Sequence, residues 1–403
     1  MSTTLAAPQL NRPLILGTLI LASMAAVMST DMYAPSLAVL PEILGTSASW
    51  VQITMGINAL FFGLAQLLHG PMADRYGRRP VMLWGVALFA LFSLLCGMAQ
   101  TIEQLIVARA LQGAAASVEA VLLLAIIGDI YSLKERPKAF ALYGMVWAVA
   151  PALAPIAGGH IHELAGWYWN FYIIAITALI AFGLSFWFLP ETGTVDKEAL
   201  QGKKIIVNYA ALLKNKAFLG LALLMSLPLA GILVYITSAP FIFQQQFDFS
   251  VTQVGYYQAL MVLAYMLASA AVPTLVNRFA QSTLIKAGVT FCLLGMLGTA
   301  LVLLSDAFSA NQILIGMLVF SLGFGPLFAV TPGLIMEQAA TSRGTAAALL
   351  GAIEMCVAGI AVAVVSAFST SPPQAMAYTF IVLAGLIGLV CGFKPWLINQ
   401  TST

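Results

Sequence analysis

Long apolar segments separated by short polar ones run along the whole chain. Most are about 20 residues or longer, which is enough for an α-helix to cross a bilayer core of about 30 Å. Division at the charged and turn-rich interruptions predicts twelve helices, at 13–38, 50–71, 81–99, 104–127, 139–162, 167–189, 217–242, 253–275, 284–304, 311–334, 345–369 and 374–394. The pattern therefore predicts an all-α integral membrane protein.

The composition supports a membrane protein and excludes a soluble fold. Of the 403 residues, 61% are hydrophobic and only 8% are charged, against roughly 25% charged residues in a typical soluble domain. The apolar run after Arg12 is too long for a secretory signal and should remain as the first span. The net charge of +2 gives no reason to expect a nucleic acid partner. The expected partner is the lipid bilayer.

One charged interruption, at 190–216, is the only plausible linker between two halves. It predicts a six-helix half at 1–189 and a second at 217–403. Placing the amino terminus inside puts every Lys and Arg outside the spans on the cytoplasmic side, as the positive-inside rule requires. Both termini and the linker are therefore expected in the cytoplasm.

A weak internal repeat supports two similar halves. Asp74 and Arg75 align with Asn277 and Arg278, 203 residues later, after the second helix of each half. Parallel repeats of this kind build transporters whose ligand site lies between the halves. We expect a central cavity at that place.

The expected loop after the second helix carries the most specific motif. It contains Gly70, Asp74, Arg75, Gly77, Arg78 and Arg79. This spacing resembles the G-x-x-x-D-R-x-G-R-R/K loop of the major facilitator superfamily, which implies that fold and a conformational latch held by Asp74. The alternative is a basic loop that only orients the protein.

The fourth helix contains Arg109 and Gln112, in a segment that resembles the R-x-x-Q-G motif of the same superfamily. At 1.5 Å per residue Arg109 lies about 10 Å outward of the membrane midplane. A cation at that depth is costly, so a partner is expected. The alternative is a static Arg that extends to the membrane surface.

The fifth helix carries a stripe of helix-bending and small residues, Gly144, Pro151, Pro155, Gly158 and Gly159. Small residues allow a neighbouring helix to approach closely. The stripe resembles the G-P-x-x-G-G signature of the family's antiporters, although Ala154 replaces its first glycine. Ordinary Gly/Pro packing is the alternative.

Three intramembrane acids are candidates for proton coupling. Asp31 lies in a first-helix segment that resembles the bicyclomycin/chloramphenicol-resistance branch of twelve-helix drug:proton antiporters. We expect Asp31 to carry the proton and Arg109 to regulate it. Glu119 and Glu354 are further candidates because intramembrane acids are usually functional. Static hydrogen-bonded acids are the alternative for both.

The expected substrate cavity is mostly apolar with a few polar groups, as ligand pockets usually are. Its candidate residues are Tyr33, Asn58, Phe61, Phe62, Gln112, Tyr143, Trp147, Tyr235, Tyr256 and Tyr257. We expect a small-molecule substrate and broad selectivity, because sparse polar contacts discriminate weakly.

The chain has no phosphate-binding P-loop and no recognisable catalytic set. Energy is therefore expected from a proton gradient, without a cofactor or metal. The resemblance implies a monomeric antiporter of the bacterial cytoplasmic membrane that exports small, mostly apolar compounds. A dedicated transporter of one metabolite is the main alternative. A membrane enzyme would need a catalytic cluster, and a receptor a large extramembrane domain.

Overall fold

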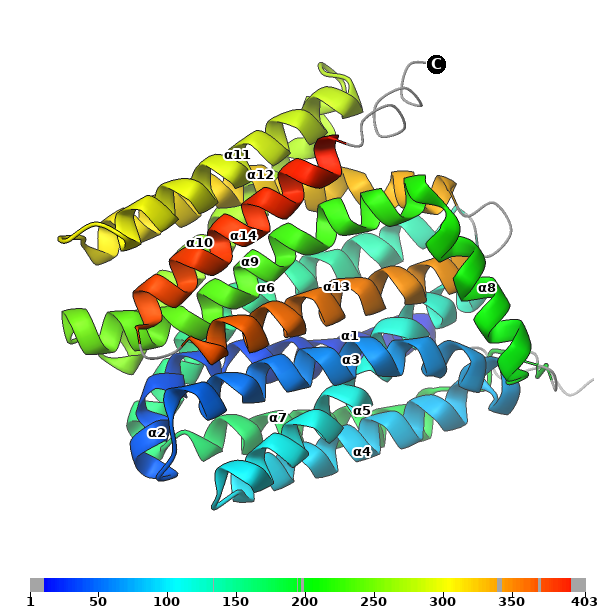
Figure 1. The fold of residues 1–403 in the computed structure, drawn as a ribbon. Coiled ribbons are helices and arrows are strands. Elements are labelled where there is room, and N and C mark those ends of the chain that lie inside the picture. The colour runs from blue at the N-terminus through cyan, green and yellow to red at the C-terminus, as the bar shows by residue number, and fades with distance from the viewer. Residues whose placement is uncertain are drawn as a thin grey trace, which may run out of the picture.

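The computed structural model describes residues 11–132, 134–193, 195–196, 199–338, 343–368 and 371–392. Twelve spans long and apolar enough to cross a membrane lie in this part of the chain, which confirms the prediction. Figure 1 shows them side by side in one bundle. The first span consists of α1 (Arg12–Asp31), the 3-10 helix η1 (Ala34–Val39) and α2 (Leu40–Ile43). The others are α3 (Ala48–Tyr76), α4 (Arg78–Met98), α5 (Ile102–Ile130), α6 (Arg136–Ala165), α7 (Tyr168–Phe188), α9 (Lys216–Phe247), α10 (Val251–Leu275), α11 (Gln281–Leu303), α12 (Ala310–Glu337), α13 (Arg343–Ala367) and α14 (Pro372–Gly392).

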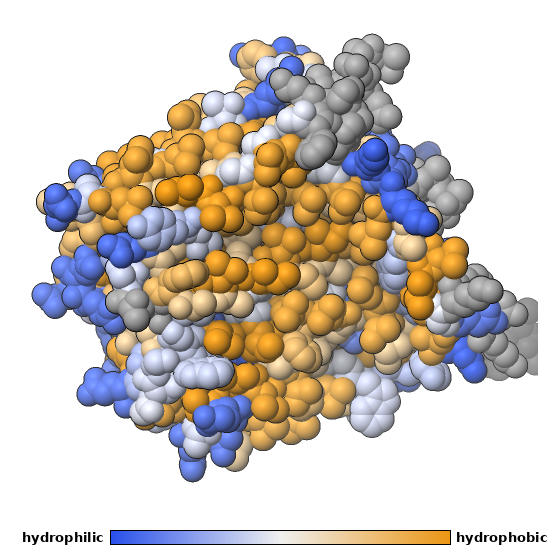
Figure 2. Space-filling model, viewed as in Figure 1, coloured by the Kyte–Doolittle hydropathy of each residue, from blue (hydrophilic) through white to orange (hydrophobic). Residues whose placement is uncertain are grey.

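The outer surface is apolar across the middle of the bundle. Figure 2 shows a broad hydrophobic band with hydrophilic groups toward both ends. Large side chains such as Trp84, Trp187 and Leu301 are at least 70% exposed. Such surface would be unstable in water, so the band is the surface that contacts lipid.

The halves meet along two pairs of helices, α3 with α13 and α6 with α10. A Cβ added to Gly63 would lie 2.9 Å from the backbone oxygen of Ala352, and one added to Gly159 would lie 2.7 Å from the Cα of Thr252. Backbones therefore touch directly at both crossings, as small residues permit in membranes.

The internal repeat has a structural counterpart in the packing of each half. Gly85 of α4 packs against Val118 of α5, and Gly288 of α11 packs against Gly323 of α12. These are the third and fourth spans of the two halves. The sequence repeat thus corresponds to equivalent helix contacts.

The first span is not the single straight helix that we expected over 13–38. Helix α1 ends at Asp31, and the chain continues as η1 and α2. Pro35 explains the break, because it has no N–H to donate to the carbonyl of Asp31 four residues earlier and its ring clashes with that carbonyl. The break places Asp31 at a helix end inside the bundle.

The reversal between α3 and α4 is shorter than the predicted loop of residues 70–80. Gly70 and Pro71 lie inside α3, and Gly77 alone separates the two helices. Gly77 has φ 95° and ψ 153°, a conformation essentially restricted to glycine. The two helices therefore extend further toward each other than the predicted bounds of 71 and 81, and the glycine at the turn is required.

The linker contains a helix that the sequence analysis did not anticipate. Helix α8 (Gly202–Lys214) crosses the ends of α9, α13 and α3 (Figure 1). We call this end of the bundle the linker end, and the opposite end, at the α9–α10 connection, the far end. These two names locate the polar contacts described next.

Candidate functional site

Arg109 is completely buried inside the N-terminal half. One guanidinium nitrogen, Nη1, donates to the backbone oxygen of Ser29 at 2.9 Å and to Oε1 of Gln112 at 2.6 Å. The guanidinium also lies 5.3 Å from the ring centroid of Tyr33 and 5.7 Å from that of Phe171. Cation–π contacts and hydrogen bonds to neutral groups therefore hold the charge.

Asp31 is the last residue of α1, two residues after the Ser29 carbonyl that binds Arg109. Its half-buried carboxyl lies within electrostatic range of the Tyr265 hydroxyl of α10, in the other half. Within the described residues no ion pair joins Asp31 to Arg109. Arg109 contacts the same span through the Ser29 carbonyl instead. Arg109 of α5 therefore contacts the end of α1 that carries Asp31, and no ion pair joins the two within the described residues.

The other two acids lie within helices α5 and α13. Glu119 of α5 is 2% exposed and lies beside Ser23 of α1. Glu354 of α13 is half-buried, and its Oε1 has no hydrogen-bond partner among the described residues. The two acids belong to different halves, so each is a separate candidate.

A cavity of about 810 Å³ opens between the halves at the linker end. Asp74, Arg78 and Ala125 line it from the N-terminal half, and Thr345 and Ala348 of α13 line it from the C-terminal half. Asn208 and Tyr209 of α8 also border it. The sequence assigned Asp74 and Arg78 to a latch and did not anticipate that they border the cavity.

Three predicted cavity residues instead lie within the core of the N-terminal half. Tyr33 is fully buried and bonds to Thr54 at 3.1 Å. Asn58 donates to the backbone oxygen of Arg109 at 2.9 Å. Gln112 donates to Oγ of Ser93 at 2.8 Å while it accepts from Arg109. These side chains hold α3, α4 and α5 around Arg109.

The predicted aromatic walls are dispersed over the molecule. Tyr235 is fully buried, whereas Tyr256 is 45% exposed and bonds to His160 at 3.2 Å. Tyr257 donates to Asn311 at 2.7 Å. The remaining candidates are Phe61, which is 37% exposed, Phe62 and Tyr143, which are half-buried, and Trp147, whose side chain lies outside the described part of the structure. None of the predicted aromatic residues lines the described cavity.

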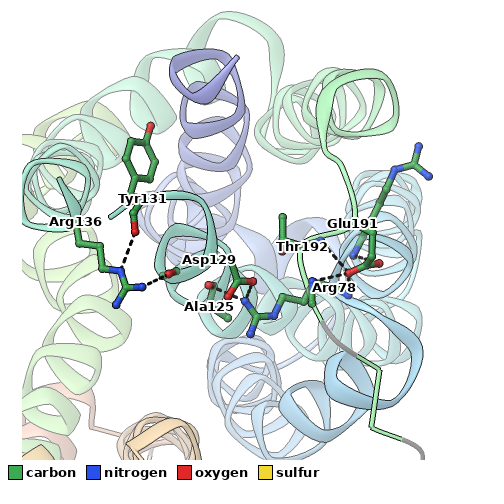
Figure 3. Close-up of polar contacts among 10 residues, drawn as sticks. Arg78, Ala125, Asp129, Tyr131, Arg136, Glu191 and Thr192 are labelled. Carbon is green, nitrogen blue, oxygen red and sulfur yellow. Dashed lines mark hydrogen bonds and ion pairs between the residues drawn. The ribbon is translucent and has the colours of Figure 1, made fainter. Parts of the chain in front are cut away.

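The linker end of the N-terminal half is held by charged side chains (Figure 3). Arg78 forms an ion pair with Asp129 and donates to the Ala125 carbonyl at 2.8 Å, which joins α4 to the end of α5. Arg136 of α6 donates to the carbonyls of Gly128 and Tyr131 at the same helix end. A cation is favourable there because of the helix dipole.

Glu191, in the segment after α7, caps the other helix at this end. Its carboxylate accepts from the backbone N–H groups of Arg78 at 2.8 Å and Arg79 at 3.2 Å, the first two residues of α4. Arg79 in turn donates to the Leu189 carbonyl at 2.7 Å, and Arg75 stacks on Tyr76. The predicted latch residues therefore bind mainly within their own half in this conformation.

Outside the spans, the α5–α6 connection is tied to the start of α1. The Arg12 guanidinium pairs with Glu135 at 3.1 Å, and hydrogen bonds from Ser132 together with this guanidinium lower the pKa of Glu135. The Tyr131 hydroxyl donates to the Arg12 carbonyl at 3.0 Å. These contacts connect the start of α1 to the α5–α6 connection at the linker end.

The α6 stripe lies at close helix contacts near the far end. Gly158 packs against the backbone of Met32, and Gly159 against Thr252 of α10. Pro155 contacts Gly255 of α10 through its carbonyl. Gly144 has no described atom within 4 Å of its Cβ position, so the contact does not extend to it. Pro151, within α6, is half-buried.

Contacts that the sequence analysis missed connect the halves at the far end. Glu163 of α6 accepts from the backbone N–H of Thr252 at the start of α10, at 3.0 Å. Gln244 of α9 donates to the Pro35 carbonyl at 3.0 Å. The far end is therefore sealed where the linker end is open. No local sequence motif marks either contact.

Comparison with known proteins identifies the family. The model of the Major Facilitator Superfamily matches residues 19–363. Similar proteins include chloramphenicol resistance protein CraA of Acinetobacter baumannii, 28% identical over 84% of this chain and 81% of the relative. The bicyclomycin resistance protein homolog of Haemophilus influenzae is 27% identical, and multidrug resistance protein D of Escherichia coli is 29% identical. Each of these two alignments covers 90% of this chain and 91% of the relative.

Solved structures agree on the fold. A POT family transporter in complex with a thioalcohol-conjugated peptide superposes with a TM-score of 0.75 over 95% of this chain and 96% of the other, at 13% identity. The expected resemblance to the bicyclomycin/chloramphenicol-resistance branch is confirmed by the similar proteins, and the expectation of a transporter rather than an enzyme is confirmed by the family. The chain belongs to the Major Facilitator Superfamily.

Proposed function

We propose that this transporter exports small, mostly apolar drug-like compounds in exchange for protons, by alternating access across the bacterial cytoplasmic membrane. The similarity to proteins named for chloramphenicol, bicyclomycin and multidrug resistance supports the substrate class. The protein acts as a monomer, since the cavity is lined by both halves of one chain.

The position of Asp31 is the observation that carries the proposal of proton exchange. It lies at the break of the first span, within electrostatic range of Tyr265 of the opposite half. Rocking of the halves changes what surrounds this carboxyl. Because loss of water disfavours the charged form and a nearby cation favours it, such a change alters its proton affinity. Arg109, fixed on the neighbouring Ser29 carbonyl, supplies the cation.

The conformation fits a state that loads substrate from the cytoplasm. The linker, which the distribution of Lys and Arg assigns to the cytoplasm, lies at the open end, and the far end is sealed. In this state Asp74 lines the cavity. When the linker end closes, Asp74 would meet the start of α13, where helix N–H groups favour a carboxylate. Asp74 would then hold the outward-facing state.

Two measurements on purified and reconstituted protein test the coupling. Chloramphenicol is the first test compound, and its gradient-driven uptake into inside-out vesicles reports export. Asp31→Asn should abolish proton-driven uptake while binding of this neutral compound persists. Arg109→Ala should impair coupling with Asp31 present, and Arg109→Lys separates loss of charge from loss of folding. Unchanged substrate-induced proton release from Asp31→Asn would move the carrier role to Glu119 and then to Glu354.

A further inference from the structure

Helix α8 is firmly attached to the bundle by one side. The Tyr209 hydroxyl donates to the Leu67 carbonyl of α3 at 3.0 Å. Leu212 packs into a cluster with Phe218 of α9 and Leu349 of α13. The linker helix therefore joins both halves, and its orientation on the bundle is set by these contacts.

The outer side of α8 is apolar and exposed. Ile206 is 68% exposed, Val207 57% and Leu213 43%. Ile206 and Leu213 are seven residues apart, so they lie on one side of the helix. Figure 2 shows apolar groups on α8 next to hydrophilic ones. Exposed apolar side chains that gather on one side of a helix mark a surface that contacts a membrane or another protein.

Lysines lie at both ends of α8 in the sequence. Lys203 and Lys204 lie in the first turn of α8, Lys214 ends it, and Lys216 begins α9 one residue later. No acidic residue occurs in α8. Helix α9 is a membrane span, so the end of α8 is held at the level of the lipid headgroups. Apolar side chains flanked by lysines are the composition of a helix that binds an anionic membrane surface.

We propose that the outer side of α8 inserts Ile206 and Leu213 into the headgroup region of the leaflet at the linker end, while its lysines bind anionic lipid phosphates. The apolar residues continue the lipid-contacting band of the spans, and the lysines match the charge of the leaflet. The linker is thereby a membrane-bound element. This inference rests on the membrane fold and is independent of which compound is transported.

Spin labels on the full-length protein test the proposal, in a background whose four native cysteines are replaced by alanine. One label replaces Ile206, and a matched control replaces Asn208, which is exposed on another side of the same helix and borders the cavity. The protein is placed in nanodiscs of phosphatidylcholine, with or without an equal amount of phosphatidylglycerol. Collision with oxygen reports contact with lipid, and collision with a nickel chelate reports contact with water.

The label at 206 should favour oxygen in discs that contain phosphatidylglycerol, and the label at 208 should favour the chelate. Each lysine changed to glutamine should weaken attachment of α8 about fivefold, which is ~1 kcal/mol per basic residue. Lys203→Gln, Lys204→Gln and Lys214→Gln together should therefore shift the label at 206 toward the chelate. Equal chelate contact at 206 and 208 in both lipid mixtures would overturn the proposal. Dipolar broadening between labels at 206 would also overturn it, because a second copy would then cover this face.

Discussion

Glu163 should hold the far end of the transporter closed. Its carboxylate belongs to α6 of the N-terminal half, and the N–H that it binds belongs to Thr252 of α10 in the C-terminal half. This contact exists only while the two helix ends meet. Loss of the contact should therefore favour molecules whose far end is open.

The size of the effect follows from the geometry. The bond is 3.0 Å long, but Glu163 is exposed, so solvent screening limits its contribution. An exposed carboxylate at a helix N-terminus contributes about 0.3–1 kcal/mol. Glu163→Gln keeps an acceptor oxygen and loses the charge, so the ratio of open to closed far ends should rise about two- to fivefold. Glu163→Ala also removes the acceptor, and a lost cap of about 0.5–2 kcal/mol would raise the ratio up to about thirtyfold.

Pulsed EPR distances measure this ratio. Labels that replace Met98 at the end of α4 and Asp306 between α11 and α12 report the separation of the halves, since both positions are exposed at the far end. The difference between Glu163→Gln and the parent should shrink at high salt, because exposed charges are screened.

Glu103→Gln is the matched control for this change. Glu103 is an exposed acid at the far end that lies in the first turn of its own helix, α5. The Glu103→Gln substitution should leave the distribution of distances between the two labels unchanged. If Glu163→Ala also leaves it unchanged at equal protein stability, then the bond to Thr252 does not hold the far end and the reasoning is refuted.

The remaining predictions concern the latch residue Asp74, the helix contact at Gly158 and the turn at Gly77. Asp74→Asn should depress chloramphenicol transport more than chloramphenicol binding, and equal transport at equal membrane abundance would contradict the latch. Gly158→Leu should destabilise the protein or abolish exchange, because a side chain would meet the Met32 backbone, whereas Gly144→Leu should be tolerated in the same helix. Normal thermal stability and activity of Gly158→Leu would show that no close contact is needed there. Gly77→Ala should destabilise the protein by about 1–3 kcal/mol, since only glycine readily adopts its backbone conformation. Thermal unfolding measures this loss, and an effect no larger than that of Gly183→Ala, at a helical position with open space, would contradict the strain.

Residues whose role depends on close contact within one half were the harder part of the site to predict. Arg109 was expected to need a partner because a cation at its depth in the membrane is costly. That its partners are the Ser29 carbonyl, Gln112 and two aromatic rings depends on how α1, α5 and α7 pack together. The predicted aromatic cavity residues failed to meet for the same reason, since each was chosen by type without knowledge of its helix face.

Helix α8 and the break at Asp31 could have been read from the sequence. Pro35 removes the hydrogen bond to the Asp31 carbonyl, which is a local rule. In α8, apolar residues recur at helical spacing between the lysines, which predicts a helix. The lysines of the segment favour a loop, and the loop was the interpretation chosen. Both signals are short-range, so both were available before the structure.

The sequence by itself determined the twelve spans and the family, because apolar length and short motifs act locally and need no knowledge of packing. It also marked Gly77, Gly158 and Gly159, although not what each of them touches and not that Gly144 lies in open space. Only the tertiary structure decided which end of the bundle is open, because that depends on contacts such as Glu163 with Thr252, whose residues lie 89 positions apart and in different halves. The state of a transporter is a balance among such contacts, and a change in a few of them reverses it while every helix stays the same.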